Sequence, residues 1–142
     1  GLRSLPILAA AVWSVLGLHA PTPADESELN FNYAAVIATH QAAFRAVEKL
    51  QLSADQRVLT AWPMTVELEQ PYLGYVQRPI RGKHIDNLPP GASLADYGFR
   101  AVLVPQRSRH TRPLRALAKK LHFKLSESFQ VKQAQALELW TP

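Results

Sequence analysis

Residues 57–78 read RVLTAWPMTVELEQPYLGYVQR, and this stretch contains, in order, the sequence signals of a strand, a turn and a helix. Val58–Trp62 is a short apolar, partly β-branched run, which is typical of a strand buried on both faces. Pro63 stands where a helix would begin, because its missing N–H costs nothing at that position. Met64–Gln70 then predicts about two helical turns, which Pro71 ends. The stretch therefore predicts a strand, a tight turn and a helix, the unit from which open α/β sheets are built.

Ligands of open α/β sheets bind at the carboxyl ends of the strands, and several polar or aromatic side chains follow the strand predicted here. We take Trp62, Glu67, Tyr75 and Arg78 as candidate substrate-binding residues. Aromatic rings can stack on a sugar, a carboxylate can bind its hydroxyls, and an arginine can bind an anion. The other interpretation, a packed Trp and Tyr beside a solvated acidic helix face, is the commoner arrangement in proteins. The sequence shows no catalytic motif, and we assign no catalytic residue.

Length and composition restrict the classes of protein and of site. The 142 residues fit one domain, and the absence of cysteine excludes a disulfide framework, a thiolate nucleophile and a cysteine zinc site. The five histidines fall at no ligand spacing, and His84 with Asp86 is the one close pair. Isolated glycines form no phosphate-binding loop. The sequence therefore predicts no metal site and no cofactor.

The net charge of +5 is distributed unevenly along the chain. Residues 1–71 carry four Lys/Arg and seven Asp/Glu, whereas residues 72–142 carry twelve and four. Arg107, Arg109 and Arg112 lie in the basic half and are our candidates for contact with an anion or a membrane surface. No aromatic platform or reading helix accompanies them, so we do not expect a nucleic-acid partner.

The N-terminal segment is almost entirely apolar from Leu5 to Leu18. Its 14 residues would make a helix of roughly 21 Å, shorter than the hydrocarbon core of about 30 Å. Two interpretations stay open for residues 1–20: the end of a transmembrane helix, or a signal or anchor segment. If Arg3 marks the cytoplasmic end of this segment, the positive-inside rule places the chain after His19 outside the cytoplasm in both cases. Residues 21–32 then read as a linker, and residues 33–142 as an extracytoplasmic α/β domain.

The first helix of this domain is expected from Tyr33 to about Leu50, with Asn32 as its N-cap. Apolar side chains and one histidine recur at helical spacing and predict its buried stripe: Tyr33, Val36, Ile37, His40, Phe44 and Val47. For His40 a hydrogen-bonded core position is favoured over a role as ligand or acid/base. Arg81–Asp86 is ambiguous between an edge strand and a loop.

The C-terminal half begins with a second buried strand, Phe99–Pro105. The basic loop 106–111 follows it, at the same edge of a parallel sheet as Trp62, so the two candidate regions are expected to face each other. A helix from Thr111 to about His122 and a closing hairpin come next. The predicted fold is thus a small three-layer, Rossmann-like α/β domain with a mostly parallel sheet and a C-terminal antiparallel hairpin, preceded by an apolar N-terminal helix.

Several short sequence segments of this chain also resemble segments of a known protein family. They are Phe31-Asn-Tyr33 before a helix with His40-Gln41, the strand Arg57-Val-Leu-Thr-Ala-Trp-Pro63, the run Leu73-Gly-Tyr-Val-Gln-Arg78-Pro79 and the turn Leu94-Ala-Asp-Tyr97. With them, residues 29–142, roughly four fifths of the chain, resemble the C-terminal soluble domain of bacterial multi-spanning membrane glycosyltransferases of the GT-C type. That group is related to protein mannosyltransferases and aminoarabinose transferases.

The resemblance implies an accessory domain on the periplasmic side of the bacterial inner membrane. The enzyme would use a polyprenyl-phosphate-linked sugar donor, and the membrane part of the same polypeptide would be the domain's partner. The family's catalytic carboxylate lies in a loop between membrane helices, so this chain alone is expected to be inactive. The alternative is a free-standing secreted or membrane-surface binding module whose basic face binds anionic lipid. A small α/β enzyme with a polar pocket near Trp62 is the third interpretation.

Overall fold

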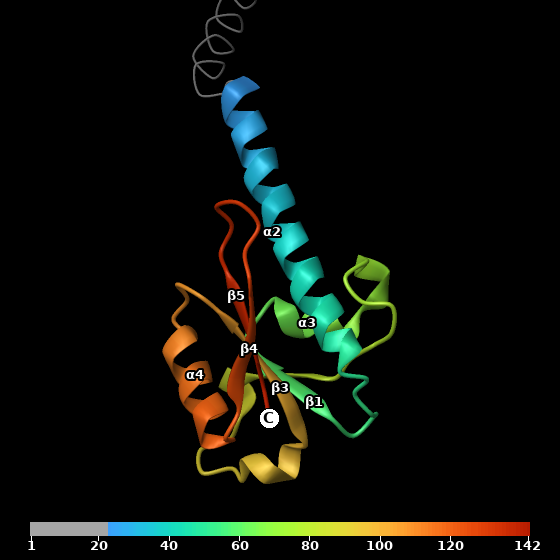
Figure 1. Cartoon of the computed structure of the whole chain (residues 1–142), viewed down its shortest axis with the longest axis vertical. Helices are drawn as coiled ribbons and strands as arrows, with labels where there is room; N and C mark the ends of the chain where they lie inside the picture. The colour runs from blue at the N-terminus through green and yellow to red at the C-terminus, as the bar shows by residue number, and fades with distance from the viewer. Residues whose placement is uncertain (1–22) are drawn as a thin grey trace, which may run out of the picture. The chain divides into compact units, whose positions relative to one another are not determined.

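The computed structural model of the protein describes the backbone of residues 23–142 and the side chains from Tyr33 onward (Figure 1). Residues 33–142 form one compact unit. The segment predicted as a membrane helix or signal, residues 1–20, lies outside the described residues. Among the helices that are described, none is both long enough and apolar enough to cross a bilayer.

The domain is a mixed α/β structure built on a five-stranded sheet with the order β2-β1-β3-β5-β4. The strands are β1 (Arg57–Thr60), β2 (Gly82–His84), β3 (Phe99–Pro105), β4 (Lys124–Phe129) and β5 (Leu137–Thr141). β1 runs parallel to β2 and β3, whereas β5 runs antiparallel to β3 and β4. The α/β class is confirmed. The expectation of a mostly parallel sheet is wrong, because the hairpin joins the sheet through β5 and makes half of the strand pairs antiparallel.

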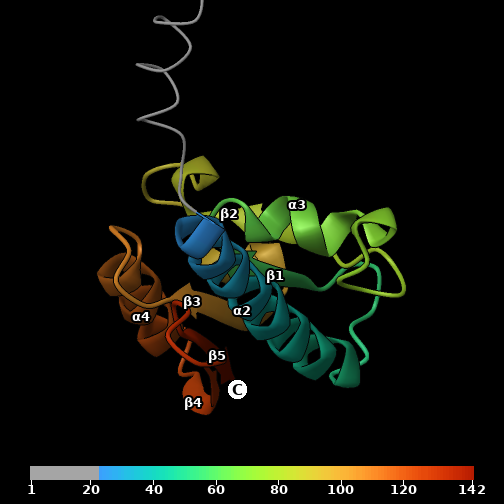
Figure 2. The same cartoon turned by 90° about the horizontal axis from the view of Figure 1, so that it is seen from above.

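Helices cover both faces of the sheet, so that two apolar cores form. The α-helices are α2 (Pro23–Lys49), α3 (Met64–Glu69) and α4 (Thr111–Lys120), and the short 3₁₀ turns are η1 (Pro71–Leu73), η2 (Ile85–Asn87) and η3 (Leu94–Tyr97). α2 and α3 bury Phe44, Val47 and Leu68 against one face of the sheet. α4 lies on the other side of the sheet (Figure 2). There it buries Leu114 and Ala118.

The predicted strand–turn–helix unit is present. β1 and α3 have nearly the expected bounds, and Pro63 occupies the N-cap position of α3 after a cis Trp62–Pro63 peptide. Met64 and Leu68 are buried beneath α3. The buried Thr60 hydroxyl donates a hydrogen bond to the carbonyl of Leu103 (3.0 Å), which ties β1 to β3. Because β1 and β3 are parallel neighbours, both strands end at the same edge of the sheet.

The start of α2 differs from the prediction. The helix begins at Pro23, so Asn32 is not its N-cap, and residues 23–32 of the expected linker are helical. A proline is compatible with the first position of a helix, and the acidic residues that follow it favour a helix N-terminus.

The buried stripe of α2 agrees with the prediction in part. Phe44 and Val47 are buried as predicted, Val36, Ile37 and His40 are half-buried, and Tyr33 is 69% exposed; Ala35, Thr39 and Ala43 are buried in addition. The Thr39 hydroxyl donates to the carbonyl of Ala35 and accepts from the N–H of Val131 (3.1 Å). The helix is thereby linked to the segment between β4 and β5.

The C-terminal half follows the prediction more closely. β3 has the predicted bounds, α4 ends two residues early, and β4 and β5 form the antiparallel pair at the end of the sheet. β4 is exposed over most of its length, and its register with β5 shifts between Leu125 and Glu127. Trp140 packs against the core that α4 covers.

Candidate functional site

The carboxyl ends of β2, β1 and β3 lie together at one edge of the sheet, because these three strands are parallel neighbours. β2 ends at His84, and 3₁₀ turn η2 follows it directly. β3 ends at Pro105 and leads into the loop before α4. Open α/β sheets bind ligands at this edge. The topology thus brings together side chains that are far apart in the sequence.

Four of these side chains, His84, Asp86, Arg109 and His110, form a contiguous polar group, the His84 cluster. Nδ1 of His84 accepts a hydrogen bond from the Asp86 N–H (3.0 Å), and Nδ1 of His110 lies 3.6 Å from Asp86 Oδ1. Arg109 donates from Nη2 to Asp86 Oδ2 (3.3 Å) and from Nε to His110 Nε2 (3.0 Å). The two imidazole rings are 5.6 Å apart and nearly perpendicular. Two ring nitrogens and one carboxylate, all potential metal ligands, therefore surround one small volume.

The loop before α4 is fixed by its own hydroxyl groups. Thr111 Oγ1 donates to the Pro105 carbonyl (2.6 Å) and accepts from the Ser108 N–H (2.9 Å). Ser108 Oγ accepts from the N–H of His110 (3.2 Å). These bonds hold the loop at the end of β3, and the His110 ring is consequently held toward β2.

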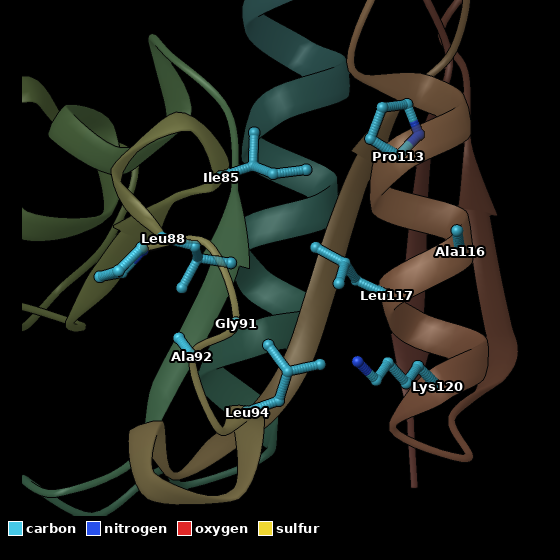
Figure 3. Close-up of a pocket in the computed structure, with 10 residues that line it drawn as sticks. Ile85, Leu88, Gly91, Ala92, Leu94, Pro113, Ala116, Leu117 and Lys120 are labelled. Atoms are coloured by element: carbon cyan, nitrogen blue, oxygen red, sulfur yellow. The ribbon is translucent and has the colours of Figure 1, made fainter.

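An apolar groove of about 460 Å³ begins beside this cluster (Figure 3). One wall comes from the segment between β2 and β3 and the other from α4, and the lining residues are Ile85, Leu88, Pro89, Gly91, Ala92, Leu94, Pro113, Ala116, Leu117 and Lys120. Ile85 and Pro113 mark the end at the His84 cluster, since they follow His84 and His110 closely along the chain. The Lys120 ammonium group lies toward the opposite end. A volume in this range suits a small-molecule ligand.

The predicted substrate residues are distributed over a different part of the domain. Glu67 Oε2 lies 2.7 Å from Nδ1 of His40, which confirms a hydrogen-bonded, largely buried histidine. Tyr75 packs edge-on to Phe44 (5.7 Å) and near His40. Burial, and secondarily the Glu67 charge, raises the pKa of Tyr75. Trp62 is 72% exposed. Glu67 and Tyr75 thus form one group with His40 at the α2 face.

Arg78 lies in a third place. Its Nη2 donates to the Leu52 carbonyl (3.4 Å), and it lines a polar hollow together with Glu48, Gln51 and Gln77. A contact with an anion at Arg78 remains a prediction. It would be made at the end of α2 and not in the apolar groove.

The predicted anion-contact residues Arg107, Arg109 and Arg112 are all exposed. Arg109 reaches the β2 side of the sheet edge through its bonds to Asp86, while Glu67 and Tyr75 sit with α2. The two predicted regions therefore share a sheet edge, but their side chains contact different faces. The reason is that β1 leads into α3 on one face, whereas β3 leads into α4 on the other.

Sequence reasoning missed the His84 cluster and the groove. His84 and His110 are 26 positions apart, so no local spacing relates them. A signal existed: if Arg81–Asp86 is taken as a parallel edge strand, both histidines follow carboxyl ends of strands in one sheet. Comparison of the chain with protein-family models, with curated proteins and with solved structures gave no match.

Proposed function

We propose that residues 33–142 are an extracytoplasmic accessory domain of a bacterial membrane glycosyltransferase, and that the domain binds the polyprenyl-phosphate part of the sugar donor. The observation that carries this proposal is the apolar groove whose lining includes one cationic side chain, that of Lys120. The family likeness of residues 29–142 supplies the class of enzyme. In this proposal catalysis belongs to the membrane part of the same polypeptide, on the periplasmic side of the inner membrane.

The chemistry of the groove suits an isoprenoid phosphate. Its walls are formed mainly by Ile85, Leu88, Leu94 and Leu117, and burial of a ligand methylene group contributes about 0.8 kcal/mol. A phosphate head would bind to the Lys120 ammonium or to the Arg109 guanidinium. The Arg109–Asp86 ion pair is largely exposed (81% and 51%) and therefore weak. Releasing Arg109 to a phosphate would cost little.

We infer further that the parallel strands β2, β1 and β3 bind the ligand beyond their carboxyl ends, as the strands of a Rossmann-like sheet do. The support is the position of the groove, which starts where β2 ends and is closed by the helix that follows β3. In such folds the crevice beyond the strands is the usual ligand site.

The test is binding of farnesyl phosphate to the 142-residue chain, with farnesol and inorganic phosphate as partial ligands. Ala116 is an exposed residue of the groove wall, so Ala116→Glu places a carboxylate in the groove without removing core volume. We expect this change to abolish binding. The control is Lys119→Gln, which makes the same change of net charge on the same helix at a residue that does not line the groove. This variant should bind farnesyl phosphate as the unmodified chain does. Farnesol should bind more weakly than farnesyl phosphate.

Equal binding by the Ala116→Glu variant and the unmodified chain would overturn the groove proposal. The second candidate, a membrane-surface module with a basic face, is favoured by the exposure of Arg107, Arg109 and Arg112. It predicts salt-sensitive binding to anionic vesicles. This binding should be lost when the three arginines are changed to alanine, and the Ala116→Glu variant should retain it. The two candidates therefore respond to different variants.

A further inference from the structure

We propose that His84, Asp86 and His110 form a binding site for a divalent transition-metal ion of the Zn²⁺ type. The three ligands come from the end of β2, from η2 and from the loop before α4. The inference does not depend on the proposed function, because it rests on the His84 cluster alone. It adds a metal to a chain whose sequence spacing predicted none.

The distances between the ligand atoms are close to those of a zinc site. With bonds of about 2.0–2.1 Å and tetrahedral angles, neighbouring ligand atoms lie about 3.3 Å apart. Nδ1 of His110 is 3.6 Å from Asp86 Oδ1, and Nδ1 of His84 is 3.9 Å from Asp86 Oδ2. One ligand atom from each of the three residues lies within 4.8 Å of the other two. The two printed distances end on different oxygens of Asp86, so binding of one ion requires the three groups to move closer together, and the Asp86 side chain, which is 51% exposed, has room to do so.

The histidine rings are held more firmly than the carboxylate. Their side chains are only 18% (His84) and 14% (His110) exposed, and they pack against each other edge-on. Nδ1 of His84 accepts the Asp86 N–H, so that nitrogen carries its lone pair, as a metal ligand must. When His84 Nδ1 binds the metal in place of the Asp86 N–H, that N–H is exposed and can donate to water.

Arg109 provides the positive charge of the cluster in the metal-free state. Its guanidinium binds both Asp86 and His110, the same two groups that would ligate the ion. The Arg109 side chain is 81% exposed, so a metal ion can displace it into solvent. When Arg109 leaves, Nε2 of His110 loses its hydrogen-bond donor, the ring proton can move from Nδ1 to Nε2, and Nδ1 becomes free to bind the ion. Arg109 is therefore a competitor of the metal.

The donor set selects the class of ion. Two imidazoles and one carboxylate suit Zn²⁺, Co²⁺ and related first-row ions, whereas Mg²⁺ and Ca²⁺ prefer oxygen ligands. Three protein ligands leave at least one position for water or an anion, as in open zinc sites.

The experiment is titration of the full chain, without a histidine tag, with Co²⁺, whose visible absorption reports inner-sphere nitrogen ligands. We expect one site per chain, displaced by Zn²⁺. His84→Ala and His110→Ala should each lower the affinity at least tenfold, and Asp86→Asn should lower it as well. His122→Asn is the matched control, because His122 is exposed and outside the cluster, and Asn tolerates its positive φ of 60°. Arg109→Gln should raise the affinity severalfold.

Circular dichroism verifies that each variant is folded, and His84→Gln replaces His84→Ala if the alanine variant is not. Absence of the Co²⁺ spectrum from the unmodified chain would overturn the proposal. So would equal affinity of the His84 and His122 variants, or weaker binding by Arg109→Gln. Farnesyl phosphate binding measured with a chelator present tests the groove separately, so failure of either proposal is recognised on its own.

Discussion

The carboxylate of Glu138 on β5 and the guanidinium of Arg115 on α4 form a two-point ion pair, in which Nε lies 3.0 Å from Oε2. Glu138 is 5% exposed and also accepts hydrogen bonds from Trp140 Nε1 (3.0 Å) and Gln106 Nε2 (2.9 Å). A buried charge is stable only when its oxygens are satisfied in this way. The pair thus joins α4 to the antiparallel part of the sheet.

Loss of the arginine from this pair should destabilise the fold. We expect Arg115→Met to lower the free energy of unfolding by about 1–2 kcal/mol, because hydrogen bonds to charged groups contribute about 1.5–3 kcal/mol and solvent screens part of it. Arg115 is 40% exposed, which places the loss at the lower end. Arg112→Met, an exposed arginine of the same helix, is the control in urea unfolding. Equal losses in the two variants would contradict the role of the pair.

The same pair makes the stability depend on pH. The hydrogen bond from Arg115 lowers the pKa of Glu138; burial opposes this effect, and the bonds from Trp140 and Gln106 add to it. The folded-state pKa is therefore below the unfolded value of about 4.3. The stability from this carboxylate is present above the unfolded pKa and is lost as the pH falls through the folded pKa. Between pH 7 and acidic pH, Glu138→Gln should thus lose less stability than the unmodified chain, and parallel losses would refute the assignment.

Two glycines with positive φ should differ in their tolerance of alanine. Gly98 (φ +63°) ends η3, and a Cβ there would lie 2.8 Å from the Asp55 carbonyl oxygen. Gly91 (φ +76°) has nothing within 4 Å of the same position. Both variants bear the cost of a left-handed alanine, but only Gly98→Ala forces the backbone apart, at about 1–3 kcal/mol more. Thermal unfolding of the two variants measures the difference, and equal losses would show that the contact relaxes freely.

The pKa of Tyr75 should depend on the charge of Glu67, which lies with Tyr75 in the group around His40. The pKa of Tyr75 is raised above 10.0 by burial first and by the Glu67 charge second. Glu67→Gln removes the charge and keeps the shape, so the pKa of Tyr75 should fall part of the way to its ordinary value. Spectrophotometric titration, with the Tyr75→Phe variant subtracted to isolate this phenol, measures the shift. Glu69→Gln on the same helix is the control and should leave the pKa of Tyr75 in place.

Local signals predicted the elements on which the domain depends. The apolar run of β1, Pro63 before α3 and the strand Phe99–Pro105 all depend on residues that are neighbours in sequence, and the structure has each of them. The start of α2 was missed because two prolines in an acidic segment suit a linker and a first helical turn equally well.

The candidate site was less predictable because it depends on strand order. His84 and His110 meet because β2 and β3 flank β1, and nothing in either local sequence encodes this neighbourhood. The groove has the same origin, since its walls come from the segment after β2 and from α4. In contrast, burial of His40 followed from helical spacing, while its partner Glu67 became known only from the fold.

The two outer strands of the sheet have a consequence for assembly. β2 has three residues, and β4 has exposed Lys124 and Glu127 beside the register shift with β5. Short, irregular and charged strands are poor templates for a further strand from another chain. The sheet therefore ends with this polypeptide, and any neighbouring protein, including a second copy, is expected to associate through side chains and not by extending the backbone ladder.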